Sequence, residues 1–362
     1  MSSPKPAFKK PETKPLYNKY DIDTLKAKVA KETEPRITIS FYRYAHITTP
    51  DVLRDTLFAA WEDLNVLGRI YVAREGINAQ CSIPESKYPF FLEHVETIFP
   101  KMPIKVAVAQ DAESFYKLVV KVRKKILADG LDDDSYDVTN VGKHLTAQEF
   151  NQAMDLPGTI VVDVRNNFES EIGYFKGALR PNVDTFKDEL PLIKNILSGQ
   201  EDKKILLYCT GGIRCEKTSA WLKHQGFKDV NQLHGGIIYY ANQVKDHGLE
   251  NKFIGKNFVF DARMGEPISD DVIAACHQCG RAADTHTNCR WDGCHLLFIQ
   301  CASCEEIMLG CCSATCRDIT KLPEIDQKIL RQKAAAETPA FRRSRRNPKE
   351  VVQLTPNTED DN

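Results

Sequence analysis

The fold of the central part of this chain is decided by one stretch, Lys204-Ile-Leu-Leu-Tyr-Cys-Thr-Gly-Gly-Ile-Arg214. Residues 204–208 form a short, mostly apolar run, and Thr159–Val164 is a second run of the same kind. A helical segment over Arg214–Gln225, stopped by Gly226, follows the first run. Continuous apolar strands separated by helices are typical of a parallel sheet that helices cover on both faces. The sequence therefore predicts an α/β domain here.

Changes of composition divide the rest of the chain. Thr146-Ala-Gln-Glu149 has the spacing of a capping box, which marks a helix start at the beginning of the α/β domain. Asp129–Tyr136 holds four Asp and a Gly, which is typical of a linker. Residues 1–33 are Pro- and Lys-rich and then polar, with one short helical stretch around Asp23–Lys31, so they offer little to bury. We expect an N-terminal extension (1–33), a ferredoxin-like domain (34–128), a linker (129–143), the α/β domain (144–250), a Cys-rich segment (251–317) and a disordered basic and acidic tail with at most one helix (318–362).

The expected ferredoxin-like domain follows from its order of elements. Apolar residues alternate over 37–41 as in a strand, and the predicted elements after it are a helix, two strands around a Glu-Gly turn, a second helix and further strands. This order is that of an antiparallel sheet with two helices on one face. The predicted ranges are Pro50–Leu64, Arg69–Ile83, Tyr88–Phe99, Lys105–Ala109 and Phe115–Lys125.

Composition excludes several classes of protein. The chain has 362 residues and is 42% hydrophobic, so it is not disordered as a whole, and its net charge of −1 does not indicate a nucleic-acid or membrane partner. The first fifteen residues carry four Pro and four Lys with no apolar core of a signal peptide, and no window approaches the ~20 apolar residues that span a bilayer. We expect a cytoplasmic protein in a reducing compartment, without membrane or DNA partners. The oligomeric state stays open.

The central stretch also predicts a reactive thiol. Cys209 follows the apolar run 204–208, so it is expected at the carboxyl end of a buried strand, where α/β sheets bind ligands. Gly211 and Gly212 let several amides converge on the sulfur, while the helix N-terminus and Arg214 add positive potential. Such surroundings lower the pKa of a cysteine below its usual ~8.5, which favours a nucleophilic thiolate. The alternative is an inert buried Cys at a strand end.

Two thiol chemistries use such a loop, namely dephosphorylation through a phosphocysteine and sulfur transfer through a persulfide. Phosphatases of this kind place Arg six residues after Cys, whereas Arg214 lies five after Cys209. A loop shorter than that of the phosphatases favours a bound group smaller than phosphate, such as a terminal sulfur.

Landmarks around the loop resemble the rhodanese family over residues 144–250. They are Asp163-Val-Arg165 with Glu169, Gly173-Tyr-Phe-Lys-Gly-Ala178, the Cys209 loop and the Gly235-Gly236 turn. The resemblance implies that Cys209 carries the persulfide and that Asp163, Arg165 and Glu169 support the loop. An exposed ion-pair cluster is the alternative for those three residues. Cys215 is the candidate for a second, resolving thiol, although its place in the first helical turn favours a side chain that faces the core.

A wider resemblance covers residues 34–316. Its strings are Ile39-Ser-Phe-Tyr-Arg-Tyr44, Arg74-Glu-Gly-Ile-Asn-Ala-Gln80, Cys209-Thr-Gly-Gly-Ile-Arg-Cys-Glu-Lys217, Gly255-Lys-Asn-Phe-Val-Phe-Asp261 and Cys276-His-Gln-Cys279. They occur in the order found in the bacterial tRNA uridine hydroxylase family. The resemblance implies tRNA as the partner, molecular oxygen as a co-substrate and 5-hydroxyuridine at the wobble position as the product. A sulfurtransferase that passes persulfide sulfur from Cys209 to a thiol is the alternative enzyme, and an RNA-binding scaffold with a vestigial rhodanese domain is the third reading. The residues show no dinucleotide-binding fingerprint.

A basic strand face is the candidate RNA surface. Alternation over residues 117–125 puts Lys117, Lys121, Arg123 and Lys125 on one face and apolar side chains on the other. With aromatic residues nearby, such a face holds phosphate and stacks bases. A solvated basic face is the alternative, and the Arg342–Arg346 run is a second candidate tether for phosphate.

Nine of the twelve cysteines lie in the 41 residues from Cys276 to Cys316. Two CxxC pairs among them, Cys276/Cys279 and Cys301/Cys304, can form a tetrahedral four-thiolate site, which favours structural zinc. Reduced core thiols or a redox relay are the alternatives, and nine Cys are enough for one or two sites.

Overall fold

A computed structural model describes residues 20–108, 114–131 and 136–337. The Pro- and Lys-rich start and the Arg342–Arg346 run lie outside the described residues. The chain divides into two compact units. The first contains the chain up to Asn166 together with Gly177–Asn251 and Phe260–Arg263, and the second contains Asn167–Lys176, Lys252–Val259 and the chain from Met264 onward.

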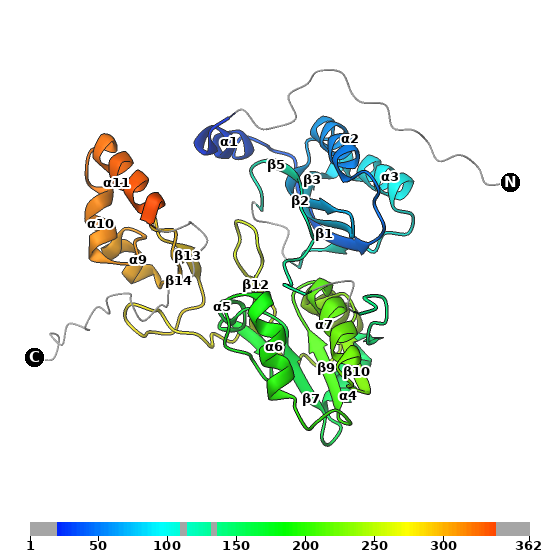
Figure 1. Cartoon of the computed structure of the whole chain (residues 1–362). Helices are drawn as coiled ribbons and strands as arrows, with labels where there is room; N and C mark the ends of the chain where they lie inside the picture. Colours follow the sequence, from blue (N-terminus) through cyan, green and yellow to red (C-terminus); the bar gives the residue numbers. More distant parts are fainter. Residues whose placement is uncertain (1–19, 109–113, 132–135, 338–362) are drawn as a thin grey trace, which may run out of the picture. The chain divides into compact units, whose positions relative to one another are not determined.

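The N-terminal part of the first unit contains a five-stranded sheet in the order β4-β1-β3-β2-β5. Figure 1 labels β1, β2, β3 and β5 of this sheet. The chain runs through α1 (Ile22–Val29), β1 (Arg36–Tyr44), α2 (Pro50–Asp63), β2 (Leu67–Ala73), β3 (Gly76–Pro84), η1 (Glu85–Lys87), α3 (Tyr88–Ile98), β4 (Lys105–Val106) and β5 (Leu118–Val122). β1 pairs with β3 along its whole length, from Arg36 opposite Pro84 to Tyr44 opposite Gly76. This confirms the expected α+β domain, with one difference: β5 joins β2 in parallel, so the sheet is not wholly antiparallel.

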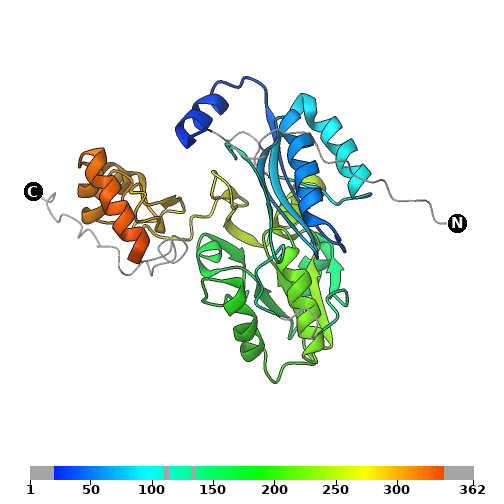
Figure 2. The ribbon, with the colours of Figure 1, turned by 45° about the horizontal axis from the view of Figure 1, so that its top comes forward.

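The helices α2 and α3 lie on one face of this sheet (Figure 2), and aromatic side chains pack between them and the strands. Phe41 of β1, Trp61 of α2 and Phe91 of α3 are at most 1% exposed. The rings of Trp61 and Phe91 lie 5.1 Å apart between centroids, and the Trp61 indole N–H donates to His94 Nδ1 at 3.1 Å. Burial of such side chains is the main stabilising term of the layer, at roughly 25 cal/mol per Å² of apolar surface.

The α/β part of the first unit contains a four-stranded, wholly parallel sheet in the order β6-β10-β9-β7. Its elements are β6 (Lys143–Leu145), α4 (Ala147–Met154), β7 (Ile160–Asp163), α6 (Phe186–Ile196), β9 (Lys204–Tyr208), α7 (Ile213–His224), β10 (Asp229–Leu233) and α8 (Gly236–His247). Four consecutive residues of β9, from Ile205 to Tyr208, have no exposed surface, which requires cover on both faces of the sheet. The capping box at Thr146 and Glu149 is present, as the sequence predicts.

The segment expected as a linker is partly buried. Asp129 is 1% exposed and Tyr136 is 7% exposed, because both contact folded parts of the first unit. The stretch expected as a linker therefore contains two buried positions.

The second unit is built from short elements. A sheet in the order β12-β11-β8 joins Glu266–Pro267, Phe253–Asn257 and Gly173–Phe175, so that β8 pairs with β11 across a long stretch of sequence. The unit is completed by a hairpin and four helices. These are β13 (His286–Asn288), β14 (Leu297–Ile299), α5 (Asn167–Ser170), α9 (Ala302–Met308), α10 (Ala314–Thr320) and α11 (Glu324–Glu337).

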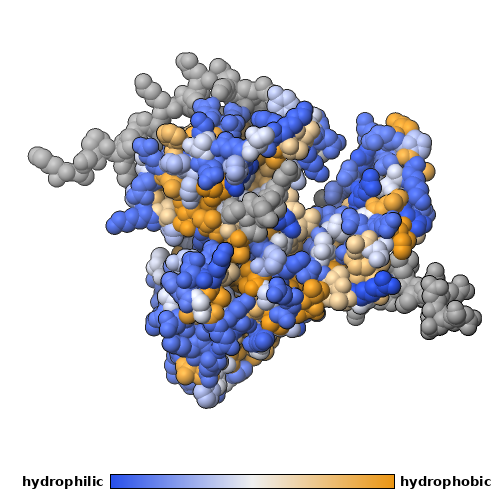
Figure 3. Space-filling view, turned by 180° about the vertical axis from the view of Figure 1, so that it is seen from behind, coloured by the Kyte–Doolittle hydropathy of each residue, from blue (hydrophilic) through white to orange (hydrophobic). Residues whose placement is uncertain are grey.

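Among the described residues, no helix has the length and apolarity to cross a bilayer. The face drawn in Figure 3 is mainly hydrophilic, with hydrophobic residues in scattered patches.

Candidate functional site at the Cys209 loop

Cys209 lies directly after β9, at the carboxyl end of the parallel sheet, as predicted. Gly212 has φ +95°, a left-handed conformation that turns the chain into α7. Gly236 is needed for close approach, since a Cβ there would lie 2.5 Å from the Cys209 carbonyl oxygen. Gly211 has an ordinary backbone conformation and open space around it, so the loop requires glycine at Gly212 and not at Gly211.

The surroundings of Cys209 stabilise its thiolate. The side chain has no exposed surface, and its burial raises the pKa. A hydrogen bond from the Cys215 thiol, the positive charge of Arg214 and the backbone amides of Cys215 and Arg214 outweigh that burial and lower the pKa of Cys209 to about 5. The Gly212 amide also donates to the sulfur, at 3.1 Å. The site therefore holds a buried thiolate at neutral pH.

Cys215 lies in the first turn of α7 and is buried in the same apolar cluster as Cys209. Burial, the hydrogen bond to Cys209 and the charge on Cys209 raise its pKa well above the usual value. Cys215 is thus a neutral donor to the Cys209 thiolate, which the sequence did not indicate.

Arg214 is 6% exposed and packs over the Phe260 ring, with 5.9 Å from the guanidinium carbon to the ring centroid. Its Nη2 donates to Thr210 Oγ1 at 3.4 Å. The guanidinium therefore lies within the loop, where the sequence places it.

Asp163 and Arg165 form a buried pair beside the sheet end. Arg165 Nε donates to Asp163 Oδ1 at 2.7 Å, and Nη2 donates to Oδ2 at 2.6 Å. The Tyr208 hydroxyl, one residue before Cys209, donates to the same carboxylate at 2.7 Å. Both charged side chains are fully buried, so the reading of an exposed ion-pair cluster is wrong for this pair. Glu169 is also buried and belongs to α5 of the second unit.

A hollow of about 490 Å³ lies beside the loop within the first unit; Cys209 does not line it, but the hydroxyl of Tyr42, which does, lies 2.9 Å from where a Cβ at Gly212 would be. Its polar lining includes Tyr42, Lys105, His144, Glu216 and His234. The Tyr42 hydroxyl donates to Glu216 Oε1 at 3.1 Å, and His144 Nε2 lies 2.9 Å from the same oxygen. The volume falls in the range of small-molecule sites.

Lys105 and Tyr42 bring the N-terminal domain to this hollow. Lys105 is 7% exposed, and its ammonium lies 4.4 Å from the centroid of the Tyr42 ring. Burial lowers the pKa of Lys105 to about 8, against the opposing charges of Cys209 and Glu216. Lys105 therefore places a cation in the hollow, and the negative charge of Cys209 raises its pKa. Sequence reasoning missed Lys105, since a lone lysine on a short strand gives no signal.

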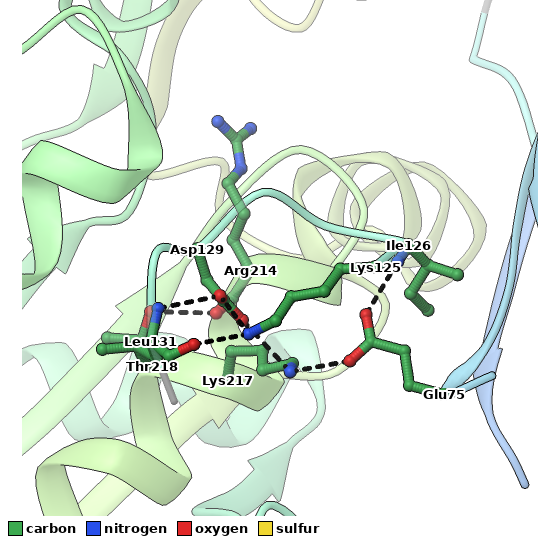
Figure 4. A network of polar contacts seen from close by, with 8 residues as sticks. All are labelled: Glu75, Lys125, Ile126, Asp129, Leu131, Arg214, Lys217 and Thr218. Atoms are coloured by element: carbon green, nitrogen blue, oxygen red, sulfur yellow. Dashed lines mark hydrogen bonds and ion pairs between the residues drawn. The ribbon is translucent and has the colours of Figure 1, made fainter. Parts of the chain in front are cut away.

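A buried polar network lies behind the loop helix (Figure 4). Lys217 is 2% exposed, and its ammonium lies 3.0 Å from Glu75 Oε2 and 3.1 Å from Asp129 Oδ2. Glu75 also accepts from the Ile126 amide at 2.7 Å. The network therefore joins the β2–β3 turn, the segment around Asp129 and the helix that begins at the thiol loop.

The predicted basic face is only partly present. Lys117, Lys121 and Arg123 are exposed, and the Arg123 guanidinium lies over the Tyr71 ring at 5.4 Å from its centroid. β5 spans Leu118–Val122, so Lys121 lies within it, whereas Lys117 precedes it, Arg123 follows it, and Lys125 pairs with Asp129 at 2.8 Å. Lys125 is therefore not part of the strand face, which corrects the sequence expectation. A hollow of about 530 Å³ beside the start of α2 is lined in part by Arg74, Arg123 and Lys124, and contact of this surface with RNA stays a prediction.

The two CxxC pairs come together in the second unit. The sulfurs of Cys276, Cys279, Cys301 and Cys304 all lie within 4.8 Å of one another, so they could hold a metal ion. Cys276 and Cys279 lie on a turn closed by a bridge between Ala275 and Ala282, and Cys301 is the N-cap residue of α9.

Three family descriptions match successive parts of the chain. Residues 36–126 match the UPF0176 acylphosphatase like domain, residues 146–243 match the rhodanese-like domain, and residues 254–317 match the rhodanase C-terminal family. Together they cover both parts of the first unit and the Cys-rich segment.

Curated relatives match nearly the whole chain. A protein of Leptospira interrogans named tRNA uridine(34) hydroxylase is 54% identical over 345 residues, which are 94% of this chain and 94% of its own length. A protein of Enterobacter sp. (strain 638) with the same name is 49% identical and covers 91% of this chain and 95% of its own length. A solved rhodanese-like domain protein from Staphylococcus aureus is 24% identical with a TM-score of 0.23, covering 27% of this chain and 90% of its own. The identities with the curated relatives show that the chain belongs to the tRNA uridine(34) hydroxylase family.

Proposed function

We propose that this protein hydroxylates carbon 5 of uridine 34 in tRNA, with Cys209 as the nucleophile. The observation that carries the proposal is the buried Cys209 thiolate next to a hollow that the N-terminal domain helps to line. Family membership supplies the substrate, because the relatives at about half identity are named for uridine 34 of tRNA. The proposal places the protein in the cytoplasm with its tRNA.

The chemistry begins with addition of the thiolate to carbon 6 of the pyrimidine. The sulfur–carbon bond forms as the electron pair of the 5,6 double bond moves toward carbon 5 and the carbonyl oxygen on carbon 4. This makes carbon 5 nucleophilic and oxygen 4 anionic. The Lys105 ammonium is a cation that lines the hollow and can bind such an oxygen, which is a role of electrostatic stabilisation.

The oxidation of carbon 5 needs molecular oxygen and two electrons, because one oxygen atom enters the base and the other leaves as water. We propose that two external thiols supply the electrons and leave as a disulfide, because the Cys209 sulfur is bonded to carbon 6 during this step. Loss of the Cys209 adduct and of the proton on carbon 5 then restores the aromatic base.

The CxxC cluster is proposed to hold a structural zinc ion. Zinc bonded to thiolates at about 2.3 Å in a tetrahedron requires sulfur–sulfur distances of about 3.8 Å. The Cys279 and Cys301 sulfurs are 3.6 Å apart, and the four sulfurs form a closed set. A closed four-thiolate site leaves no position for substrate, so the ion would hold the fold and take no part in hydroxylation.

Nucleoside analysis tests the function. A strain that lacks the protein should have no 5-hydroxyuridine in its tRNA, and the wild-type gene should restore it while the Cys209→Ser variant should not. Labelled oxygen gas should place one labelled atom in the nucleoside. Unchanged 5-hydroxyuridine with Cys209→Ser would remove the nucleophile from the proposal.

A plain sulfurtransferase is the second candidate, and the five-residue spacing from Cys209 to Arg214 favours it. Sulfur transfer from thiosulfate to a thiol requires Cys209 but neither tRNA nor oxygen. If purified protein transfers sulfur and tRNA hydroxylation is unaffected by its loss, this second reading is the correct one.

A further inference from the structure

A second group of four cysteines lies in the same unit and does not follow the CxxC pattern. It consists of Cys289, Cys294, Cys312 and Cys316, whose sulfurs all lie within 4.8 Å of one another. Cys289, Cys312 and Cys316 are at most 6% exposed, and Cys294 is 9% exposed. Four residues separate Cys289 from Cys294, and three separate Cys312 from Cys316, so neither pair has the CxxC spacing.

From this geometry we propose that these four cysteines bind a second zinc ion, so that the Cys-rich segment holds two. The proposal goes beyond the hydroxylase function and does not depend on it.

The distances fit one metal ion held by four thiolates. The sulfurs of Cys294 and Cys312 are 3.6 Å apart, and those of Cys312 and Cys316 are 3.7 Å apart. A tetrahedron of about 2.3 Å zinc–sulfur bonds has edges of about 3.8 Å. A disulfide needs about 2.05 Å between sulfurs, and an iron–sulfur cluster needs more room because several irons and sulfides lie between its thiolates.

The local fold repeats that of the first cluster. Cys289 follows β13 and Cys294 precedes β14, so both lie at a hairpin turn, and the Cys289 amide donates to the Leu296 carbonyl at 2.8 Å. Cys312 precedes α10 and Cys316 lies within it. In the first cluster a turn likewise supplies two cysteines, and the start of α9 supplies the other two. A turn and a helix start therefore supply each set of four sulfurs.

The apolar core of this part of the chain is too small to replace a metal. The cluster of buried residues contains Leu296 and Phe298, and its other members are five cysteines, with Trp291 packed against it. Cysteine buries less apolar surface than the large aliphatic residues that usually fill a core, and small metal-binding folds gain the missing stability from the ion.

Two buried glutamines connect the clusters. Gln278, between Cys276 and Cys279, donates from Nε2 to the Cys311 and Cys312 carbonyls at 3.0 and 3.3 Å. Gln300, which precedes Cys301, donates to Gln278 Oε1 at 2.8 Å. The backbone of the second cluster is thus held by side chains of the first, so loss of either ion should weaken binding of the other.

Metal analysis of full-length protein, purified from zinc-supplemented cells without chelator, is the first test. Wild-type protein should contain two zinc ions per chain. Cys316→Ser and Cys301→Ser should each lose at least one, whereas Cys311→Ser should keep two. Cys311 is the matched control because its buried thiol lies in the same apolar cluster but outside the group of four. One zinc ion in wild-type protein, lost with Cys301→Ser and kept with Cys316→Ser, would overturn the proposal, as would iron in place of zinc.

A second measurement does not depend on how well the variants fold. Replacement of zinc by Co²⁺ in the wild-type protein should give thiolate-to-metal charge-transfer absorption that saturates at two ions per chain. In denaturant with a chelator, all twelve cysteines should react as free thiols. Saturation at one Co²⁺, or a deficit of four thiols that reductant restores, would show disulfides or one site in place of two.

Discussion

Replacement of Cys215 by alanine should raise the pKa of Cys209. Cys215 donates a hydrogen bond to the Cys209 thiolate and carries no charge itself, so its removal takes away a stabilising contact and leaves Arg214 in place. Cys215→Ser is the matched variant, because its hydroxyl can donate to the same sulfur.

The expected shift can be worked from the site. The pKa of Cys209 falls from an ordinary 9.0 to about 5, and each unit corresponds to about 1.4 kcal/mol. A hydrogen bond to a charged group contributes roughly 1.5–3 kcal/mol, which is about one to two units. Cys215→Ala should therefore move the pKa of Cys209 to between about 6 and 7, and Cys215→Ser should leave it near the wild-type value.

The rate of alkylation by iodoacetamide as a function of pH measures this pKa. Mass spectrometry of the Cys209 peptide separates this cysteine from the other eleven. The midpoint of the rate gives the pKa even though burial slows the reaction at every pH. A wild-type midpoint near 9 would refute the stabilised thiolate, and equal midpoints for the wild type and Cys215→Ala would refute the role of Cys215.

The same shift determines how stability depends on pH. A thiol whose pKa is lower in the folded protein stabilises that state fully above its unfolded pKa, near 9. That stabilisation is lost as pH falls through the folded pKa of about 5.

Three further changes test other parts of the site. The wild-type hydroxylation rate should fall above pH 8, where the Lys105 ammonium loses its proton. Lys105→Met should lower the rate and abolish that fall, and an unchanged pH–rate profile would contradict a role for the charge. Lys217→Met should destabilise the protein by about 1.5–3 kcal/mol in urea unfolding, since buried Asp129 loses one of its two ammonium partners and keeps Lys125; a loss below ~1 kcal/mol would show that the Lys217 contacts are not stabilising. Lys121→Gln with Arg123→Gln should weaken tRNA binding and flatten its salt dependence by roughly 0.7–0.9 per lost contact, and wild-type affinity and slope would place the RNA surface elsewhere.

Local signals allowed the thiol loop to be predicted closely. The strand at Lys204–Tyr208 was expected with the observed bounds, and the helix after it begins at Ile213, within one residue of the expected start. Apolar runs, glycines and capping residues all act within a few positions of the chain, so one sequence is enough to read them.

Contacts between distant residues could not be read in the same way. The alternation of apolar and basic residues predicts Lys125 on a strand face. In the structure the strand ends at Val122, and Lys125 forms an ion pair with Asp129. Lys105 is 104 positions from Cys209, and only the folded chain brings its charge near the sulfur. The sequence places Glu75 in a turn, whereas its contact with Lys217 depends on how two domains pack.

Successive residues of α7 contact different neighbours, which gives each residue from Arg214 to Lys217, in the segment that follows the nucleophile, a contact of its own. A helix turns about 100° per residue, so neighbours in sequence point in different directions. Arg214 and Cys215 act on the Cys209 sulfur, whereas Glu216 accepts from the N-terminal domain at the hollow. Lys217 pairs with that domain on the buried side of the helix. The first two of these contacts act on the sulfur itself. The other two tie the thiolate to the domain proposed to bind RNA, so replacements at Glu216 and Lys217 should impair tRNA hydroxylation more than sulfur transfer at Cys209.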